Sequence, residues 1–195
     1  MALSLEKIQK LREQTAASMN DVKRALDEAK GDEQAALIVL RKQGKALADK
    51  KSSRATGAGI IASYVHGDGR IGVLLELRCE TDFVAKTAEF QSLAHDLALH
   101  IAAAKPKYTR PEDVPQGVLE AEKEIYLSQV AALKKPENVA LEIIKGKVQK
   151  YYDDVCLLNQ RFVKDDSKTI KEVVAETVVK VGENIEVGKF VRFEI

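Results

Sequence analysis

The residues Glu80-Thr81-Asp82-Phe83-Val84 bring two acids, a hydroxyl and an aromatic ring together in one short segment. They follow a stretch of apolar alternation and precede a stretch of helical spacing, which places them at a strand-to-helix corner. Two interpretations stay open. In one, Thr81 or Asp82 caps the helix while Phe83 packs against the core. In the other, Phe83 projects as an aromatic anchor for a partner's pocket, with an acid beside it.

The histidines and cysteines form no recognisable site. His95 and His100 lie five residues apart on an expected helix, which differs from the i, i+4 pair typical of a metal site. Cys79 and Cys156 each lie among apolar residues, as buried, reduced thiols do. No serine lies in a nucleophile elbow, and neither cysteine has an activating neighbourhood. We therefore expect no metal, no cofactor and no enzyme active site, and a hydrolase is the weakest interpretation.

A glycine motif, Gly67-Asp-Gly69-Arg-Ile-Gly72, matches the dinucleotide-binding fingerprint letter for letter. That fingerprint holds a pyrophosphate only where a helix begins directly after it. Here the glycines lead into the alternating residues 71–79. We therefore interpret the motif as the turn of a β-hairpin.

The charge balance argues against nucleic acid as a partner. Thirty-one basic side chains stand against thirty acidic ones, a net charge of +1. Proteins that depend on phosphate contacts usually show a marked basic excess. The N-terminus meets charged residues at once, and no apolar run approaches the ~20 residues needed to span a bilayer. We expect a cytoplasmic protein that binds neither nucleic acid nor membrane.

Three short helices are predicted within residues 1–44. Ser18-Met-Asn-Asp21 has the form of a capping box, Asp32 is a suitable N-cap, and Gly31 and Gly44 are expected at helix ends. Helices this short are unstable singly, because helix nucleation is costly. We therefore expect a small bundle of the ubiquitin-associated type.

Residues 45–56 are basic and have little apolar content, which predicts a helical linker. An RNA-binding patch is the sharper alternative, but no aromatic residue is interleaved there to stack on a base. We therefore expect a solvated connection between two units.

Residues 57–195 predict an α+β core in which a small antiparallel sheet is backed by helices. The helix that is expected after the Glu80–Val84 corner carries an apolar stripe. Two charged helices within 116–150 predict a projecting helical hairpin. The last part predicts a strand over 155–163, a helix around 170–178 and an alternating strand over 185–195.

The chain resembles the elongation factor Ts family, the exchange factors of the GTPase elongation factor Tu. Cys79-Glu-Thr-Asp-Phe-Val-Ala-Lys86 is similar to the central signature of that family, and this octapeptide is highly specific. Further similar stretches are Leu11-Arg-Glu-Gln-Thr15, Ser63-Tyr-Val-His-Gly67 and Pro111-Glu-Asp-Val114. The resemblance covers nearly the whole chain.

The resemblance implies guanine-nucleotide exchange without covalent chemistry. In that mechanism the N-terminal helices dock on the nucleotide-binding domain of elongation factor Tu, in its GDP-bound and nucleotide-free forms. The corner then displaces the Mg²⁺ ion that holds GDP, with Phe83 as a wedge and Asp82 near the magnesium. The residues that it assigns to magnesium dislocation are Thr81, Asp82, Phe83 and Val84, and those that it assigns to docking are Arg12, Met19 and His66.

The chain departs from the family pattern in length. Many members carry two copies of the core, whereas this chain has length for one, so His66 and the corner share a copy. We therefore expect homodimerisation through the 57–195 core, which would rebuild a two-core platform. Asn20 and the turn Ala16-Ala17-Ser18 also depart from the family pattern, which leaves the docking contacts open. The main alternative is a binding adaptor with a ubiquitin-associated-like domain and no exchange activity.

Overall fold

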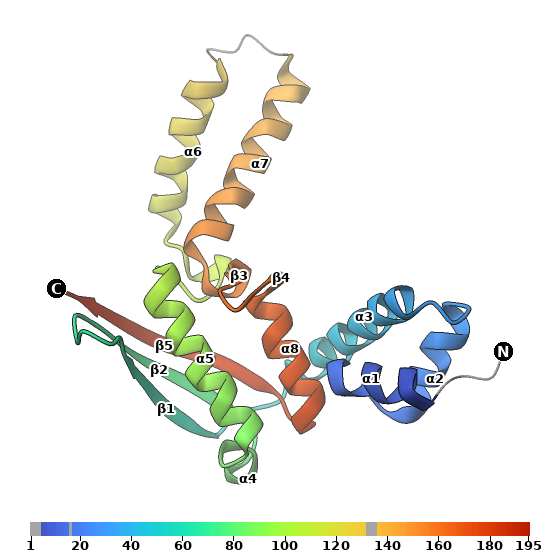
Figure 1. Cartoon of the computed structure of the whole chain (residues 1–195). Helices are drawn as coiled ribbons and strands as arrows, with labels where there is room; N and C mark the ends of the chain where they lie inside the picture. The colour runs from blue at the N-terminus through green and yellow to red at the C-terminus, as the bar shows by residue number, and fades with distance from the viewer. Residues whose placement is uncertain (1–4, 16, 132–135) are drawn as a thin grey trace.

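The computed structural model describes residues 5–15, 17–131 and 136–195. Within them the chain is α+β, as predicted, with a three-stranded antiparallel sheet and helices around it (Figure 1). The helices are α1 (Leu5–Thr15), α2 (Met19–Glu28), α3 (Glu33–Lys51), α4 (Asp82–Ala85), α5 (Ala88–Ala104), α6 (Gln116–Ala131), α7 (Glu137–Val155) and α8 (Ile170–Val181), with 3-10 turns at Pro111–Asp113 and Leu157–Asn159. The strands are β1 (Ala58–Val65), β2 (Ile71–Cys79), β3 (Arg161–Phe162), β4 (Asp165–Thr169) and β5 (Ile185–Glu194).

The predicted N-caps of α2 and α3 are confirmed. Ser18 Oγ accepts a hydrogen bond from Asp21 N at 3.1 Å. The Asp32 carboxylate accepts from two amides in the first turn of α3, at 2.8 and 3.1 Å. The first left-handed residue after α2 is Lys30, at φ 51°, one position before the predicted Gly31, which follows it at φ 85°.

The predicted helix end at Gly44 is wrong, because α3 continues to Lys51. A single glycine inside a helix costs only about 1 kcal/mol relative to alanine. Here α3 packs on α8, and a Cβ at Gly44 would lie 3.4 Å from Val179 Cγ2. The close approach of the two helices suits a glycine at this position. Residues 45–51 of the predicted linker therefore form the last turns of α3.

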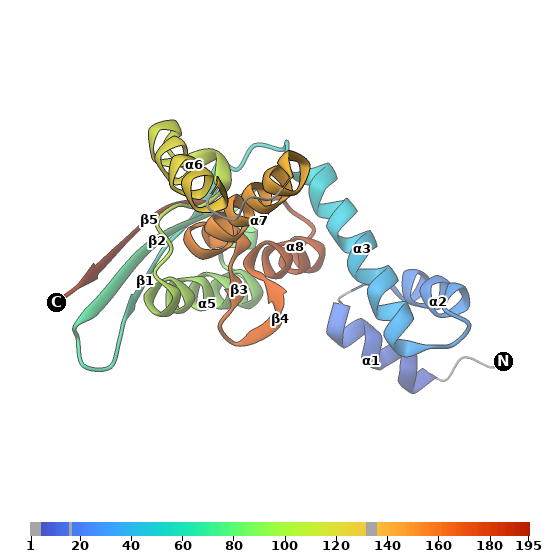
Figure 2. The ribbon, with the colours of Figure 1, turned by 90° about the horizontal axis from the view of Figure 1, so that it is seen from above.

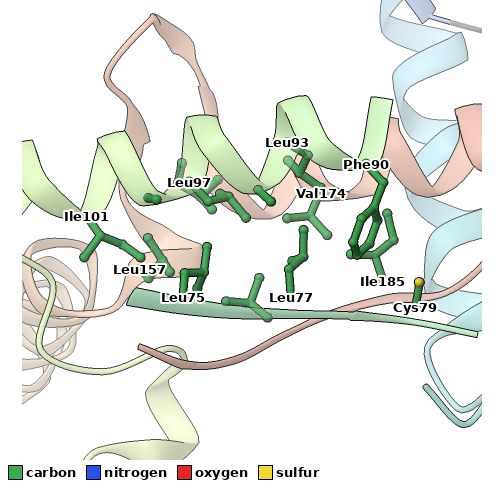
Figure 3. Packing of buried hydrophobic residues seen from close by; sticks show 14 of the residues in the cluster. Leu75, Leu77, Cys79, Phe90, Leu93, Leu97, Ile101, Leu157, Val174 and Ile185 are labelled. Atoms are coloured by element: carbon green, nitrogen blue, oxygen red, sulfur yellow. The ribbon is translucent and has the colours of Figure 1, made fainter. Parts of the chain in front are cut away.

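Buried apolar side chains form separate clusters. One lies among α1, α2 and α3, and a second lies at the base of the α6–α7 hairpin. The largest lies between the sheet, α5 and α8, and Figure 3 shows its members Phe90, Leu93, Leu97 and Ile101 on α5, Leu75 and Leu77 on β2, and Val174 on α8. The division of the chain at residues 44 and 56 stays a prediction.

The β-hairpin is confirmed, and it contains the glycine motif. β1 and β2 pair antiparallel, from Ala58 opposite Cys79 to Val65 opposite Gly72. Gly69 takes φ 74° at the turn, where its lack of a Cβ makes the left-handed conformation accessible. The motif therefore closes a hairpin, as predicted, and precedes a strand.

The last strand differs from strict alternation. Leu75 of β2 pairs with Phe190 of β5, but Leu77 pairs with Val187, so β5 has an extra residue between them. Such a bulge reverses which face the following side chains occupy. As a result Val187 is buried, whereas Phe193 is exposed on the other face of the sheet.

The predicted strand over 155–163 is wrong. α7 extends to Val155, a 3-10 turn follows, and only Arg161–Phe162 form a strand. Cys156 and Leu157 are fully buried, and a short apolar run of this kind does not distinguish strand from other buried backbone. The projecting hairpin is seen as predicted in Figure 1, although residues 132–135 lie outside the described residues.

A buried histidine joins α5 to the segment after α7. His100 is 1% exposed, and its Nδ1 accepts from Val163 N at 3.2 Å. Its Nε2 therefore carries the proton and donates to Gln160 Oε1 at 3.0 Å. Burial lowers the pKa of His100 below its ordinary value of 6.5, because the charged ring would lose its hydration.

This neutral histidine predicts a loss of stability in mild acid. As pH falls through 6.5, the unfolded chain binds a proton at His100 and the folded chain does not, so the free energy of unfolding falls until the lower folded pKa is reached. The slope is at most about 1.4 kcal/mol per pH unit. Urea unfolding of wild type and His100→Gln from about pH 7.5 to about pH 5.5 measures it. His95→Gln, at an exposed position, is the control; equal slopes for wild type and His100→Gln would contradict the expectation.

Candidate functional site

The corner after β2 starts two helices in succession. Thr81 is the N-cap of the single-turn helix α4, and its Oγ1 accepts from Val84 N at 3.4 Å. Thr87 then caps α5, and its Oγ1 accepts from Phe90 N at 3.3 Å. The capping role predicted for Thr81 is confirmed. The longer helix, α5, begins at Ala88.

The side chains of α4 point in two directions. Phe83 is 87% exposed, while Val84 beside it is only 8% exposed and belongs to the core cluster. The interpretation in which Phe83 packs against the core is therefore wrong. Thr81 and Asp82 are exposed with Phe83, so these three residues form the accessible surface of the corner. Val84 packs into the core beneath that surface.

Two groups tie the Thr81 backbone and side chain to the rest of the core. The Glu183 carboxylate accepts from Thr81 N at 3.0 Å and from Thr81 Oγ1 at 2.7 Å. The Cys79 thiol donates to Thr81 O at 3.2 Å. Burial raises the pKa of Cys79, which keeps the thiol protonated as a donor.

Glu183 is a residue of this site that sequence reasoning missed. It lies 102 positions from Thr81, on the turn between α8 and β5. Helical or strand spacing reports only neighbours along the chain. The position carries no local signal that would connect it to the corner.

Asp82 places a carboxylate next to the exposed ring of Phe83. Across the part of the chain that the structure describes, no hydrogen bond or ion pair engages its side chain. Carboxylate oxygens are hard ligands of the kind that Mg²⁺ prefers. The corner can therefore offer an apolar ring and a free acid to the same surface of a partner.

The other predicted site residues lie away from the corner. Arg12 is exposed on α1, and Met19 is 43% exposed at the start of α2. Asn20 and Ser18 are exposed beside Met19, while Ala16 lies outside the described residues. Arg12 and Met19 therefore belong to the N-terminal helices, which Figure 1 shows at a distance from α4.

His66 lies at the hairpin turn, where Tyr64 Oη is 3.1 Å from its Nδ1. The corner follows the opposite end of β2, which is 9 residues long. At about 3.4 Å per residue, His66 and Asp82 are on the order of 30 Å apart along the hairpin. Within one chain, His66 and Asp82 are therefore too far apart to belong to one contact site.

Both thiols are buried and free, as predicted, and burial raises the pKa of Cys156 to about 11. Over the described ranges 5–15, 17–131 and 136–195, no three histidine, cysteine or acidic side chains gather closely enough to hold a metal ion. In the same ranges, none of the helices combines the length and the apolar character that crossing a membrane requires.

Comparison with known proteins gives matches along the full chain. The family model described as elongation factor TS matches residues 3–195. The elongation factor Ts of Thermotoga petrophila is 52% identical over 195 residues, which are 100% of this chain and 97% of that protein. The elongation factor Ts of Maridesulfovibrio salexigens is 47% identical over 195 residues, 100% of this chain and 95% of that protein.

These relatives are also close to this chain in length, because each match covers nearly the whole of both proteins. The elongation factor Ts of Thermotoga maritima is 51% identical, and the match covers 100% of this chain and 97% of that protein. The Thr81–Phe83 corner lies inside the matched region. The chain therefore belongs to the elongation factor Ts family, which acts in translation elongation.

Proposed function

We propose that this chain is a guanine-nucleotide exchange factor for elongation factor Tu in the cytoplasm, and that its corner promotes GDP release by displacing Mg²⁺. The observation that carries the proposal is the 87% exposure of Phe83 on a corner whose backbone is tied down. A large exposed ring on ordered backbone is a suitable anchor, because little conformational freedom is lost when it enters a pocket.

The proposed mechanism makes and breaks no covalent bond. Binding linkage is reciprocal. If nucleotide weakens the binding of this chain to elongation factor Tu by some ratio, the chain must weaken nucleotide binding by the same ratio. Bound Mg²⁺ is among the largest local charges in a nucleotide site, so moving it releases much of the hold on the phosphates. In this scheme Phe83 enters the partner and brings the Asp82 carboxylate toward the magnesium.

The docking part of the proposal uses the N-terminal helices. Arg12 and Met19 are exposed on α1 and α2 and would contact the nucleotide-binding domain of the partner. The helices have an apolar cluster of their own, so they can present that surface without support from the corner. In this division the N-terminal helices hold the partner while Asp82 and Phe83 perturb its nucleotide site.

Release of fluorescent GDP from elongation factor Tu tests the proposal directly. We expect the 195-residue chain to accelerate release at catalytic concentrations, because an exchange factor dissociates when new nucleotide binds. A binding adaptor would form a complex with elongation factor Tu or another protein and leave the release rate unchanged. That outcome would replace the proposal by the adaptor alternative.

We also propose that two chains form a homodimer through the open face of the sheet. α5 and α8 cover one face, and Figure 2 shows α5 along that side. The other face carries exposed apolar side chains on all three strands, namely Ile61, Val65, Leu74, Val191 and Phe193. In the register of the sheet, Leu74 is opposite Ser63 and Val191, and Gly72 between Val65 and Phe193 leaves room beside them.

A second copy is the occupant that this face suits. A two-fold dimer brings the same patch of both chains together, so an apolar patch is complementary to itself. The dimer would also provide a corner and a His66 from different chains, which one chain holds on the order of 30 Å apart. The two-core platform expected from the family pattern would then be complete.

Introducing a charge at the centre of this face should abolish the dimer. Leu74→Glu would bury a carboxylate against its counterpart, and an unpaired buried charge is strongly unfavourable. We expect sedimentation at micromolar concentration to give a dimer for wild type and a monomer for Leu74→Glu. The control is Leu127→Glu, because Leu127 is 53% exposed on α6 and away from the sheet. A strictly monomeric wild type would refute the dimer.

A further inference from the structure

The turn between α8 and β5 contacts two parts of the molecule at once. Gly182 ends α8 at φ 77°, and Glu183 and Asn184 follow it into β5. Glu183 binds the amide and the hydroxyl of Thr81, as described above. Asn184 N donates to Glu80 Oε1 at 2.6 Å, so the turn holds both residues at the start of the corner.

The same turn holds the chain that leaves α3. Asn184 is 6% exposed, and its Nδ2 donates to Ser52 O at 3.3 Å and to Arg54 O at 2.8 Å. Lys51 Nζ, at the end of α3, donates to Gly182 O. The backbone that connects the N-terminal helices to β1 is therefore fixed to the turn that fixes the corner.

Glu80 contacts both the turn after α8 and the segment after α3. Its Oε1 accepts from Asn184 N and lies 3.5 Å from Arg54 Nη1. Glu80 is only 23% exposed at its side chain, so this carboxylate is partly shielded from water. Three segments that are distant in sequence, 51–54, 80–81 and 182–184, meet here through hydrogen bonds and this ion pair.

We infer that Glu183 and Asn184 are positioning residues for the exchange reaction. They hold the Thr81–Phe83 corner at a fixed place relative to the end of α3, and hence relative to the docking helices. The inference rests on the proposed function of the corner. Neither residue needs to touch the partner for this role.

The physical reason is preorganisation. α4 is a single turn of four residues, and a helix this short does not keep its geometry without tertiary support. An anchor that must be ordered on binding loses part of its binding free energy to conformational entropy. A displacement of about 1 Å at a reacting group can cost on the order of 100-fold in rate. Two bonds from Thr81 to one carboxylate remove that freedom before the partner arrives.

Glu183→Ala tests the inference in the whole 195-residue chain. It removes both bonds to Thr81 while leaving Phe83 and the docking residues unchanged. We expect the maximal rate of fluorescent-GDP release to fall about tenfold or more, because one charge-assisted hydrogen bond already corresponds to a factor of about ten and two are removed. The concentration that gives half of the maximal rate should change little, because the docking helices set it. Glu124→Ala, at an exposed position on α6, is the matched control.

The double variant Glu183→Ala/Phe83→Ala separates positioning from other roles. If Glu183 acts by placing Phe83, the double variant releases GDP no more slowly than Phe83→Ala alone. Fully multiplicative effects would show that Glu183 acts elsewhere and would overturn the inference. Thermal melting of Glu183→Ala must stay close to that of wild type, since a large fall would reduce the role of Glu183 to stability.

Two further outcomes keep the inference distinct from the function on which it rests. If Phe83→Ala slows release and Glu183→Ala does not, the corner works without this support and the inference fails alone. If Phe83→Ala itself has no effect on release, the proposed function of the corner fails and the inference fails with it. Asn184→Ala tests the other positioning residue independently, because it removes the hydrogen bonds to the carbonyls of Ser52 and Arg54 while Glu183 stays in place.

Discussion

Replacing Phe83 by alanine is expected to slow GDP release from elongation factor Tu by about 30-fold or more, the effect typical of a central aromatic anchor. The reason is the orientation of the corner: Phe83 is 87% exposed, so its ring is available to a partner and contributes little to packing in the free protein. Fluorescent-GDP release at several concentrations of the variant measures the loss.

The fold should tolerate this change. Substitutions at exposed positions usually alter the free energy of unfolding by no more than about 0.5 kcal/mol. Urea unfolding of Phe83→Ala should therefore overlay that of wild type. Leu127→Ala, at another exposed apolar position, controls for the general loss of surface hydrophobicity. Unchanged GDP release by Phe83→Ala would contradict the proposed role of the ring.

Replacing Phe90 by alanine should have the opposite pattern and the largest effect on stability. Phe90 is completely buried at the start of α5, and Figure 3 shows its ring next to Ile185 and close to Cys79. Removing a buried phenylalanine costs about 3–5 kcal/mol, from lost transfer free energy and from the cavity that remains. This loss is a large part of the 5–15 kcal/mol that typically stabilises a protein.

The two phenylalanine variants form a matched pair, because the same atoms are removed seven residues apart. Urea unfolding should move strongly for Phe90→Ala and hardly at all for Phe83→Ala. GDP release per folded molecule should show the reverse order. A loss of less than about 1 kcal/mol in Phe90→Ala would mean that the core at the base of the corner relaxes around the cavity.

Local signals in the sequence were sufficient for several parts of the fold. The Ser18 and Asp32 caps, the Gly69 turn and the apolar stripe of α5 depend on residues within a few positions of one another. Hydrogen bonds and steric limits over such distances act almost independently of the rest of the chain. For the same reason the strand-to-helix corner was placed correctly.

Predictions failed where packing between distant segments overrode a local preference. Gly44 does not end α3, because the helix continues along α8. The apolar residues after Val155 form buried irregular backbone, because the end of α7 enters the core there. The bulge in β5 turns Phe193 outward, although alternation from Ile185 suggests a single face.

At the corner, too, some features followed from the local sequence and others from the tertiary structure. Its sequence determined that Thr81 caps a helix and, through the octapeptide Cys79–Lys86, that the chain resembles its family. Only the tertiary structure decided that Val84 turns inward while Phe83 turns outward, because this choice depends on which side of α4 the sheet and α5 cover. It also decided that Glu183 supports Thr81 across 102 positions, since a contact between distant segments exists only once the core has brought them together.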